Sequence, residues 1–292
     1  MPVIAIDHLI LPVADVAAAA APFERLGLTL TPLAQHSTGH ENRAFFAGNG
    51  DTEFYVEILG VHDRARAELS PSWTVQQRAR EGGTGATGIV LRCDDLEVLQ
   101  ASLSRAGTPG EIAEAFREDG SKLCDILRPD VSARAGCEVS FIRYPESASS
   151  RAARHSAAGL FRHALPLLRV DHLAIIAPAL DEMTAFWADV LNVPVYGEVR
   201  GRGMVIRQMK IGDAVVELLG PDSPESPLAS RPAGLISMAA FEVTSLDGAV
   251  EFARGRGFTA PDGAAGVLPR SRTSTISPNQ LSGLALQLIE FV

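Results

Sequence analysis

Two histidines and two glutamates occupy matching places in the two halves of this sequence, inside stretches that are otherwise apolar. His8 stands in IDHLIL and Glu57 in FYVEIL, while His172 stands in VDHLAI and Glu217 in VVELL. Alternate residues of a strand share a face, so each of these side chains has apolar neighbours on its own face. A buried carboxylate without a partner is costly, so each glutamate requires a partner or a water-filled hollow. An imidazole and a carboxylate that face one hollow can hold a divalent ion that polarises a carbonyl or enediolate oxygen, or can form a neutral hydrogen-bonded pair.

A polar loop between the first predicted helix and the following strands carries further reactive side chains. It reads HSTGHENR and runs from His36 to Arg43. Asn42 and Arg43 are the main candidates for binding an anionic or carbonyl-bearing substrate, because a guanidinium can donate two parallel hydrogen bonds. His40 is the third candidate. The alternative interpretation is an exposed polar loop, although loops at pocket rims often carry function.

An internal repeat predicts the elements that position these residues. IDHLILPVADVAAAAAPFERLGL, residues 6–28, reappears as VDHLAIIAPALDEMTAFWADVLNV, residues 170–193. Each copy predicts a strand that ends near a proline and then a helix, with Asp15 or Asp181 as its N-cap and Gly27 at the end of the first. Strand-like runs follow each helix, namely NRAFFAG and TEFYVEIL in the first copy and MVIRQMKIG and AVVELLG in the second.

A weaker βαβββ pattern recurs inside each half. TGIVLRCDDLEVLQASLSRAG, residues 87–107, aligns with MAAFEVTSLDGAVEFARGRG, residues 238–257, so the chain contains four modules. The halves close on the strand-like segments CEVSFIRYP and LALQLIEFV. We therefore expect a first domain at 1–147, a linker at 148–167 that is rich in Ser, Ala and Arg, and a second domain at 168–292.

Two groups of side chains are predicted to serve structure rather than chemistry. The basic residues of the linker region are expected to be solvated, and they are Arg151, Arg154, Arg162, Arg169, His155 and His163. Phe186 and Trp187 have the spacing of core residues on the helix of the second copy.

Composition excludes several classes of protein. The 292 residues suffice for two domains, and 46% apolar with 21% charged residues is the balance of a folded globular protein. A net charge of −9 repels nucleic acid and anionic membranes, so neither is an expected partner. The amino terminus lacks the basic region of a secretory signal, and no apolar run approaches the ~18 residues of a membrane span, so we expect a cytoplasmic protein. Three cysteines without CxxC spacing indicate neither a disulfide framework nor a thiolate metal site.

The openings IDHLILPVAD and VDHLAIIAPALD, each followed by a helix and a strand carrying EIL or ELLG, resemble those of the vicinal oxygen chelate superfamily of glyoxalases, bleomycin-resistance proteins and extradiol dioxygenases. The resemblance covers nearly the whole chain. The first half is similar to the glyoxalase-like group through GLTLTP and the H-x-x-G-x-x-N-R loop, and the second half is closer to methylmalonyl-CoA epimerase through ELLGPDSPESPL, MAAFEV and SPNQLSGLALQLIEF. The resemblance implies an α+β fold, in which four βαβββ modules form two tandem glyoxalase-like domains with curved mixed sheets.

The same resemblance implies a divalent ion in the concavity of each sheet, bound by side chains from the first and last strands of the modules. Carried over by position, the ligand places are His8, Glu57, Gly88 and Ser140 in the first half and His172, Glu217, Met238 and Gln287 in the second. Each half thus keeps one histidine and one glutamate, and the amide of Gln287 is a weaker third ligand. Glu57 and Glu217 are also the candidate catalytic bases.

Two functions fit these ligand sets. The first is an enzyme, a metal-assisted isomerase, lyase or dioxygenase that acts on a small oxygenated substrate with Fe, Mn, Zn, Ni or Co. The second is a metal-free binding protein of the bleomycin-resistance type, which is favoured by the fact that zinc and iron sites usually take three or more protein ligands. A small molecule is the expected partner in both, and either a monomer or a homodimer fits.

Overall fold

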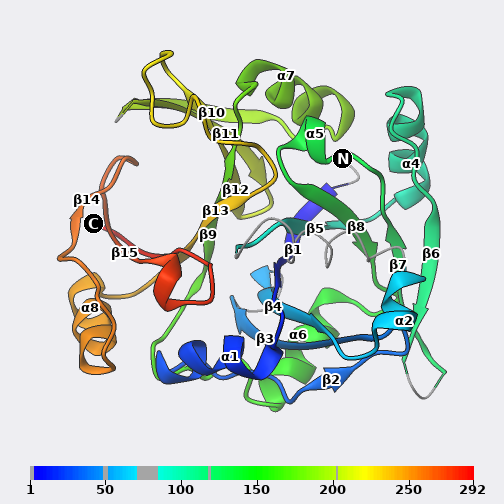
Figure 1. The fold of residues 1–292 in the computed structure, drawn as a ribbon, viewed down its shortest axis with the longest axis horizontal. Helices are drawn as coiled ribbons and strands as arrows, with labels where there is room; N and C mark the ends of the chain where they lie inside the picture. The colour runs from blue at the N-terminus through cyan, green and yellow to red at the C-terminus, as the bar shows by residue number, and fades with distance from the viewer. Residues whose placement is uncertain (1–2, 49–51, 71–84, 118–119, 202) are drawn as a thin grey trace. The chain divides into compact units, whose positions relative to one another are not determined.

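The computed structural model describes residues 3–48, 52–70, 85–117, 120–201 and 203–292, and its strands form two eight-stranded mixed sheets (Figure 1). The strands of the first sheet are β1 (Val3–Pro12), β2 (Ala34–Gln35), β3 (His40–Ala47), β4 (Phe54–Val61), β5 (Gly88–Cys93), β6 (Ile112–Phe116), β7 (Lys122–Leu127) and β8 (Glu138–Arg143). Those of the second are β9 (Arg169–Ile176), β10 (Val195–Gly201), β11 (Met204–Ile211), β12 (Ala214–Pro221), β13 (Ile236–Glu242), β14 (Ala264–Ala265), β15 (Ser271–Ile276) and β16 (Leu286–Phe291).

The two sheets have the same strand order, which follows from the sequence repeat. The first runs β2-β3-β4-β1-β5-β8-β7-β6 and the second runs β10-β11-β12-β9-β13-β16-β15-β14. In each second module the first and last strands, β5 with β8 and β13 with β16, are parallel. Hairpins such as β11–β12, which turns through Gly212 and Asp213, are antiparallel. The predicted α+β fold of four βαβββ modules with curved mixed sheets is confirmed.

Short helices connect the strands of every module. They are α1 (Val16–Arg25), α2 (Arg64–Glu68), α4 (Leu96–Arg105), α5 (Ser132–Ala135), α6 (Ala148–Ala157), α7 (Leu180–Ala185) with its π-helical extension Phe186–Val190, α8 (Leu246–Gly255) and a 3-10 turn at Pro278–Gln280. No helix in the described part of the chain is both long enough and apolar enough to cross a membrane.

Residue contacts group the chain into two compact units, and each unit draws on both halves of the sequence. Unit 1 contains Met1–His8, Gly88–Arg151 and Leu173–Ile236, and unit 2 contains Leu9–Thr87, Ala152–His172 and Ser237–Val292. The second module of the first half and the first module of the second half therefore fall in unit 1. The expected division into residues 1–147, 148–167 and 168–292 stays a prediction of the repeat pattern.

Helix starts follow capping rules in three of the four modules. The Asp15 carboxylate accepts a hydrogen bond from the backbone N–H of Ala18 at 2.9 Å, and Asp95 and Ser245 cap α4 and α8 in the same way. Gly27 follows α1 with a φ of +93°, a conformation that favours glycine at a helix end.

The predicted N-cap at Asp181 is wrong. Helix α7 starts at Leu180, after Ala179, which makes no side-chain cap hydrogen bond. Asp181 lies inside the first turn, and its carboxylate pairs with the Arg207 guanidinium at 3.3 Å instead. Asp181 therefore links helix α7 to β11 and does not cap the helix.

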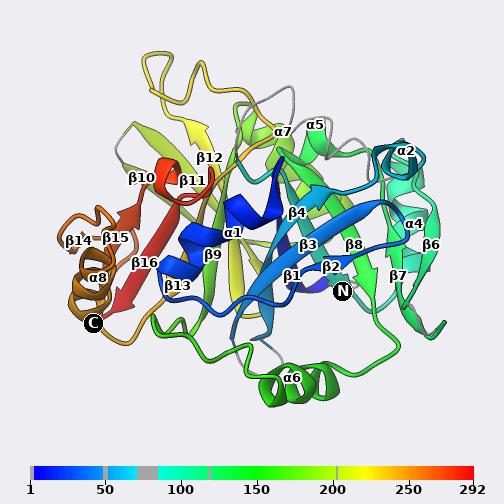
Figure 2. The same cartoon turned by 60° about the horizontal axis from the view of Figure 1, so that its bottom comes forward.

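Unit 2 has an aromatic core that joins modules from both halves of the sequence. Helix α1 lies along β3 and β4 (Figure 2), and its Phe23 ring centre is 5.4 Å from that of Phe45. Phe241 of β13 lies 5.9 Å from both Phe45 and Phe54. All four rings are fully buried, so this core is closed to water.

The core of unit 1 contains the two aromatic residues that the helix spacing predicted. Phe186 and Trp187 are 1% and 0% exposed, which confirms that they are core residues. The Trp187 indole N–H donates to the Ala135 carbonyl at 3.0 Å, so its polar atom has a partner.

The predicted linker includes the helix α6 and a partly buried segment, and the prediction that all its basic residues are solvated is wrong. Arg151 is only 4% exposed within unit 1. In unit 2, the His155 Nδ1 lies 2.8 Å from the carboxylate of Glu53, which is itself buried. His163 is half-buried, whereas Arg154 and Arg162 are exposed as expected. The composition of this segment indicated a solvated linker. The prediction failed because the partners of the buried side chains lie about a hundred residues away in sequence, where local composition does not reveal them.

The contacts of His163 with Thr29 and Phe46 in unit 2 are sensitive to pH. Its Nδ1 accepts from the Thr29 N–H at 2.9 Å, and its Nε2 donates to the Phe46 carbonyl at 2.6 Å, so the neutral ring is required. Burial lowers the pKa of His163, and the Phe46 carbonyl only partly opposes this. The folded value is thus below the unfolded value of about 6.5, so the stabilisation is complete above that pH and is lost as the pH falls through the folded pKa.

We therefore expect the urea concentration at the unfolding midpoint of the wild-type chain to decrease when the pH is lowered from about 7 to about 5. We expect this decrease to be smaller in His163→Gln. His62→Gln is the matched control, because His62 is exposed. If the midpoint of His163→Gln decreased with pH as much as that of the wild type, other groups would be responsible for the pH dependence.

Candidate functional site

The Glu57 carboxylate lies on one face of the β3–β4 hairpin in unit 2. Glu57 is paired with Ala44 across the hairpin, so alternation places His40 and Asn42 on the same face and Arg43 on the opposite face. The Asn42 side-chain amide donates to Glu57 Oε1. Glu57 is half-buried, and one of its partners is therefore an amide on the neighbouring strand.

Glu217 has the same kind of partner in unit 1. It is paired directly with Gln208 across the β11–β12 hairpin, and the Gln208 Nε2 donates to Glu217 Oε1 at 3.0 Å. Both side chains are buried, at 7% and 4% exposed. The sequence interpretation missed Gln208, although counting outward from the two-residue turn at Gly212 and Asp213 would have found it.

Each candidate histidine is anchored by the aspartate that precedes it. His8 Nδ1 lies 2.8 Å from Asp7 Oδ1, and His172 Nδ1 lies 2.8 Å from Asp171 Oδ2. An ionised carboxylate can only accept, so Nδ1 is the donor in both contacts. A metal-binding histidine held in this way by a carboxylate uses its other ring nitrogen, Nε2, as the ligand atom. The sequence interpretation missed these aspartates, and the signal for them was the Asp-His dipeptide that both copies share.

Asp7 belongs to a buried network of charges in unit 1. Its Oδ2 accepts from Nε and Nη2 of Arg92 at 3.1 Å each, and its Oδ1 accepts from the Tyr144 hydroxyl at 3.0 Å. Arg151 Nη2 lies 3.9 Å from the same carboxylate, and its guanidinium stacks 3.9 Å from the centre of the Tyr144 ring. Burial alone would raise the pKa of Asp7, but the His8 hydrogen bond and the two guanidiniums lower it to about 2. Burial and the nearby Asp7 charge raise the pKa of Tyr144.

Asp171 has a smaller set of partners in unit 2. Besides His172, its carboxylate pairs with Arg169 Nη2 at 3.2 Å. The same guanidinium pairs through Nε with Glu242 at 2.7 Å. At equivalent positions of the repeat, Asp7 thus pairs with Arg92 and Arg151, whereas Asp171 pairs with Arg169, which also pairs with Glu242.

The three predicted substrate-binding residues differ in their contacts. His40, the first residue of β3, is 3% exposed, and its Nδ1 lies 3.1 Å from the Thr38 hydroxyl. Asn42 uses its amide nitrogen to hold Glu57. Arg43 donates to the Thr31 carbonyl at 2.9 Å and to Glu24 of α1 at 2.7 Å, so it ties the helix to the sheet. Their binding of a substrate stays a prediction.

Gln287 lies on β16 in unit 2, where it is paired with Thr275 and, on the parallel side, with Ala240. Its Nε2 donates to the Thr275 hydroxyl at 3.3 Å. The amide oxygen is therefore the atom of Gln287 that can act as a ligand.

The pairing of each histidine with its glutamate stays a prediction. His8 belongs to unit 1 and Glu57 to unit 2, while His172 belongs to unit 2 and Glu217 to unit 1. The strands that carry each pair are adjacent, because β4 is next to β1 in the first sheet and β12 is next to β9 in the second.

The donor atoms partly fit a divalent ion. Within the described ranges, no three His, Cys, Asp or Glu side chains form a group that could hold a metal. The two ligand types that are present are nevertheless supported as metal ligands usually are, since each imidazole has a carboxylate on Nδ1 and each carboxylate has an amide donor. This donor set suits an ion that keeps water or substrate oxygens in its shell, and it does not suit a closed structural zinc site.

Two of the three cysteines are poor nucleophiles. Cys93, Cys124 and Cys137 are all buried, and none of them forms a disulfide. Burial raises the pKa of Cys93 and of Cys124 to about 11, so their thiolate forms are scarce at neutral pH.

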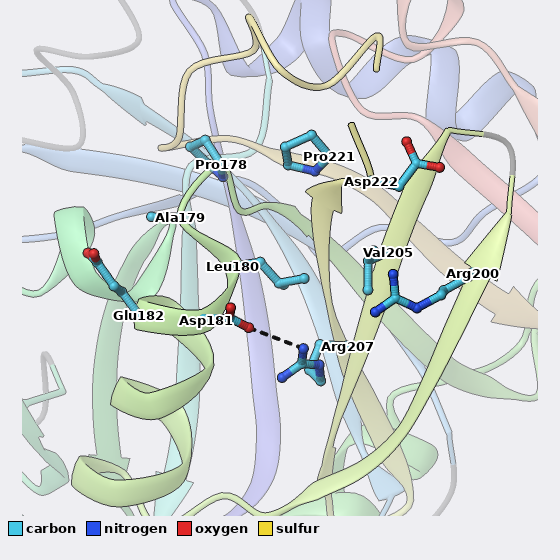
Figure 3. Close-up of a pocket in the computed structure, with 10 residues that line it drawn as sticks. All are labelled: Pro178, Ala179, Leu180, Asp181, Glu182, Arg200, Val205, Arg207, Pro221 and Asp222. Carbon is cyan, nitrogen blue, oxygen red and sulfur yellow. Dashed lines mark hydrogen bonds and ion pairs between the residues drawn. The ribbon is translucent and has the colours of Figure 1, made fainter. Parts of the chain in front are cut away.

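A groove of about 420 Å³ lies in unit 1 (Figure 3). It is lined by the start of α7 and by residues of β10, β11 and β12, including Val205 and Arg207. Alternation places Val205 and Arg207 on the face of β11 opposite to Gln208. The groove is therefore on the helix side of the sheet, where Asp181 pairs with Arg207.

Comparison with known families and structures agrees with the fold. Residues 6–191 match the model of the glyoxalase-like domain, and residues 171–269 match that of the glyoxalase/bleomycin resistance protein/dioxygenase superfamily. No curated protein matches the sequence.

Among solved structures, a mutant of 4-hydroxymandelate synthase from Streptomyces coelicolor is similar over 100% of this chain and 93% of its own, with a TM-score of 0.69 and 17% identity. A hypothetical protein from Staphylococcus aureus is similar over 98% of this chain and 99% of its own, with a TM-score of 0.64 and 12% identity. Methylmalonyl-CoA epimerase from Mycobacterium tuberculosis covers 43% of this chain and 89% of its own, with a TM-score of 0.40 and 23% identity. At these identities the likenesses show the fold alone.

Proposed function

Because the chain belongs to the glyoxalase-like domain family, we propose that it is an enzyme that uses a divalent ion to act on a small oxygenated molecule. The observation that carries this proposal is the repeated support of the ligand side chains. In both copies an aspartate fixes the histidine tautomer, and in both an amide on the adjacent strand holds the glutamate. Fixed ligands of this kind are what a metal site needs.

The proposal gives the histidines and the glutamates different roles. The imidazoles of His8 and His172, whose Nδ1 donates to the preceding aspartate, would be the nitrogen ligands of an ion. Glu57 and Glu217, whose Oε1 accepts from an amide on the adjacent strand, are the carboxylates assigned to ligation and proton transfer. A bound divalent ion would supply Lewis acidity to a carbonyl or enediolate oxygen of the substrate. Isomerisation, lyase chemistry and oxygenation all begin from this arrangement, so the family does not fix the reaction type.

The competing proposal is a metal-free binding protein of the bleomycin-resistance type. The number of ligands favours it, since each half contributes one histidine and one glutamate and the second half adds only the amide of Gln287. Such a protein would hold a small aromatic or hydrophobic compound against the sheet.

Metal content separates the two proposals. We expect protein purified without chelator or metal-affinity resin, and then offered Mn²⁺, Fe²⁺, Zn²⁺, Ni²⁺ or Co²⁺, to retain about one to two ions per chain by elemental analysis. The double variant His8→Gln/His172→Gln removes both imidazole ligands and should retain none, while His62→Gln, at an exposed position, should match the wild type. A wild-type content below about 0.1 ion per chain with every metal would favour the binding protein.

A further inference from the structure

We propose that β10 is a docking edge at which a second copy of this chain pairs with the first, strand against strand. β10 is the terminal strand of the second sheet and belongs to unit 1 (Figure 1). Within the described part of the chain, no backbone hydrogen bond joins it to a strand other than β11. The outer N–H and C=O groups of a terminal strand are a template for another strand. The inference concerns assembly, and it is independent of the proposed function.

The length and openness of β10 distinguish it from the other terminal strands. β2 and β14 have two residues each and β6 has five, whereas β10 has seven. Its pairing with β11 is irregular between Val195 and Gly197 and regular from there to Gly201. A Cβ atom added to Gly201 would meet no atom within 4 Å, so this end of β10 leaves room for an approaching backbone.

A two-fold axis at Val199 makes the charges of β10 complementary to those of a second copy. Closed pairs of identical chains form around two-fold axes, so two copies of one terminal strand pair antiparallel. With Val199 on the axis, Glu198 of each copy lies directly opposite Arg200 of the other. Such opposed residues have Cβ atoms about 4.5 to 5.5 Å apart, which is within reach of a salt bridge. Gly197 then faces Gly201, where no side chain obstructs the pairing.

The side chains of Glu198 and Arg200 can make these contacts without losing the ones they have. Arg200 uses Nε and Nη2 for Glu198 of its own strand, at 2.9 and 2.8 Å. No hydrogen bond or ion pair to another described residue uses its Nη1, and the side chain is 66% exposed. Glu198 also pairs with Arg207 of β11 at 3.0 Å, which holds the carboxylate on the face that Arg200 shares. A carboxylate has several acceptor sites and a guanidinium several donors, so a further pair across the axis fits both.

β6, the next longest terminal strand, lacks this charge pattern. It reads IAEAF, so a two-fold pairing places Glu114 either against itself or against an uncharged side chain. Glu114 is also paired with Lys122 of β7 at 2.8 Å. Length and charge together therefore select β10 as the edge that a second copy fits.

Sedimentation equilibrium of the full chain tests the proposal. We expect the wild type to dimerise reversibly at concentrations up to about 0.5 mM. Arg200→Glu and Glu198→Lys each place like charges opposite one another, so each variant alone should dimerise at least about tenfold more weakly. An equimolar mixture of the two variants again has opposite charges at both places. It should form a heterodimer with close to the wild-type affinity.

Two further variants keep the result specific. Arg105→Glu makes the same change of charge at an exposed position on helix α4 of unit 1, and it should dimerise as the wild type does. Glu198→Gln replaces Glu198→Lys if circular dichroism shows that Glu198→Lys is unfolded. In a mixture with Arg200→Glu it leaves one Glu198–Arg200 pair and no like-charge contact, so the mixture should associate more tightly than Arg200→Glu alone.

Hydrogen exchange locates the contact. The backbone amides of β10 should exchange more slowly above the dimerisation midpoint than below it, while those of β6 should not change. The proposal is overturned by a wild type that stays monomeric over this range, by protection at strands other than β10, or by a mixture that associates no better than its components. None of these results depends on metal content, so the proposed function stands or fails separately.

Discussion

Asp7→Asn should lower the free energy of unfolding by about 3 to 5 kcal/mol, because it removes a buried negative charge that pairs with Arg92 and Arg151 inside unit 1. The guanidiniums stay buried after the substitution, and their desolvation is no longer offset by that carboxylate. The amide can accept hydrogen bonds but cannot balance charge. Urea unfolding followed by circular dichroism measures the loss.

The same substitution at Asp171 is the internal control. Asp171→Asn should cost about 1 kcal/mol, since Arg169 is partly exposed and keeps its pair with Glu242. Equal losses at the two positions would show that the buried arginines around Asp7 do not make its charge more important for stability than the charge of Asp171. The comparison is matched in residue type, in strand position and in the adjacent histidine.

Phe241→Ala should lower the free energy of unfolding by about 3 to 5 kcal/mol as well. The ring is fully buried and lies 5.9 Å from Phe45 and from Phe54, so its removal leaves a cavity beside these two aromatic rings of unit 2. The unfolding midpoint in urea reports the effect.

Phe291→Ala serves as the control for Phe241→Ala, because that ring is 43% exposed and its loss should cost less than about 1 kcal/mol. A small effect of Phe241→Ala would mean that β13 is not an integral part of the core of unit 2. The prediction thus also tests whether modules from the two halves share one core.

The repeat allowed most of the fold to be predicted. Hydrophobic periodicity and the two related openings located the first strand and helix of each half, and the family resemblance supplied the order of the remaining elements. The N-cap at Asp181 failed because a salt bridge to Arg207 competes with capping, and pattern rules do not include contacts 26 residues away in sequence.

The candidate site could be predicted only in part. The cost of a buried carboxylate correctly required partners for Glu57 and Glu217, but the identity of those partners depends on strand register. Asp7 and Asp171 were missed because strand alternation assigns consecutive residues to opposite faces, so a hydrogen bond between neighbours is not expected. The burial of Arg151 beside Asp7 was not predicted, because the Ser-, Ala- and Arg-rich segment around it has the composition of a solvated linker.

The mixing of modules in the two units has a consequence for fragments of this chain. A cut within the segment 158–168 leaves each fragment with one part of unit 1 and one part of unit 2. Neither fragment would contain a complete core, since Phe45 and Phe54 stand on one and Phe241 on the other. We expect the two pieces to be poorly folded apart and to complement each other when co-expressed, so the chain should behave as a split protein rather than as two separable domains.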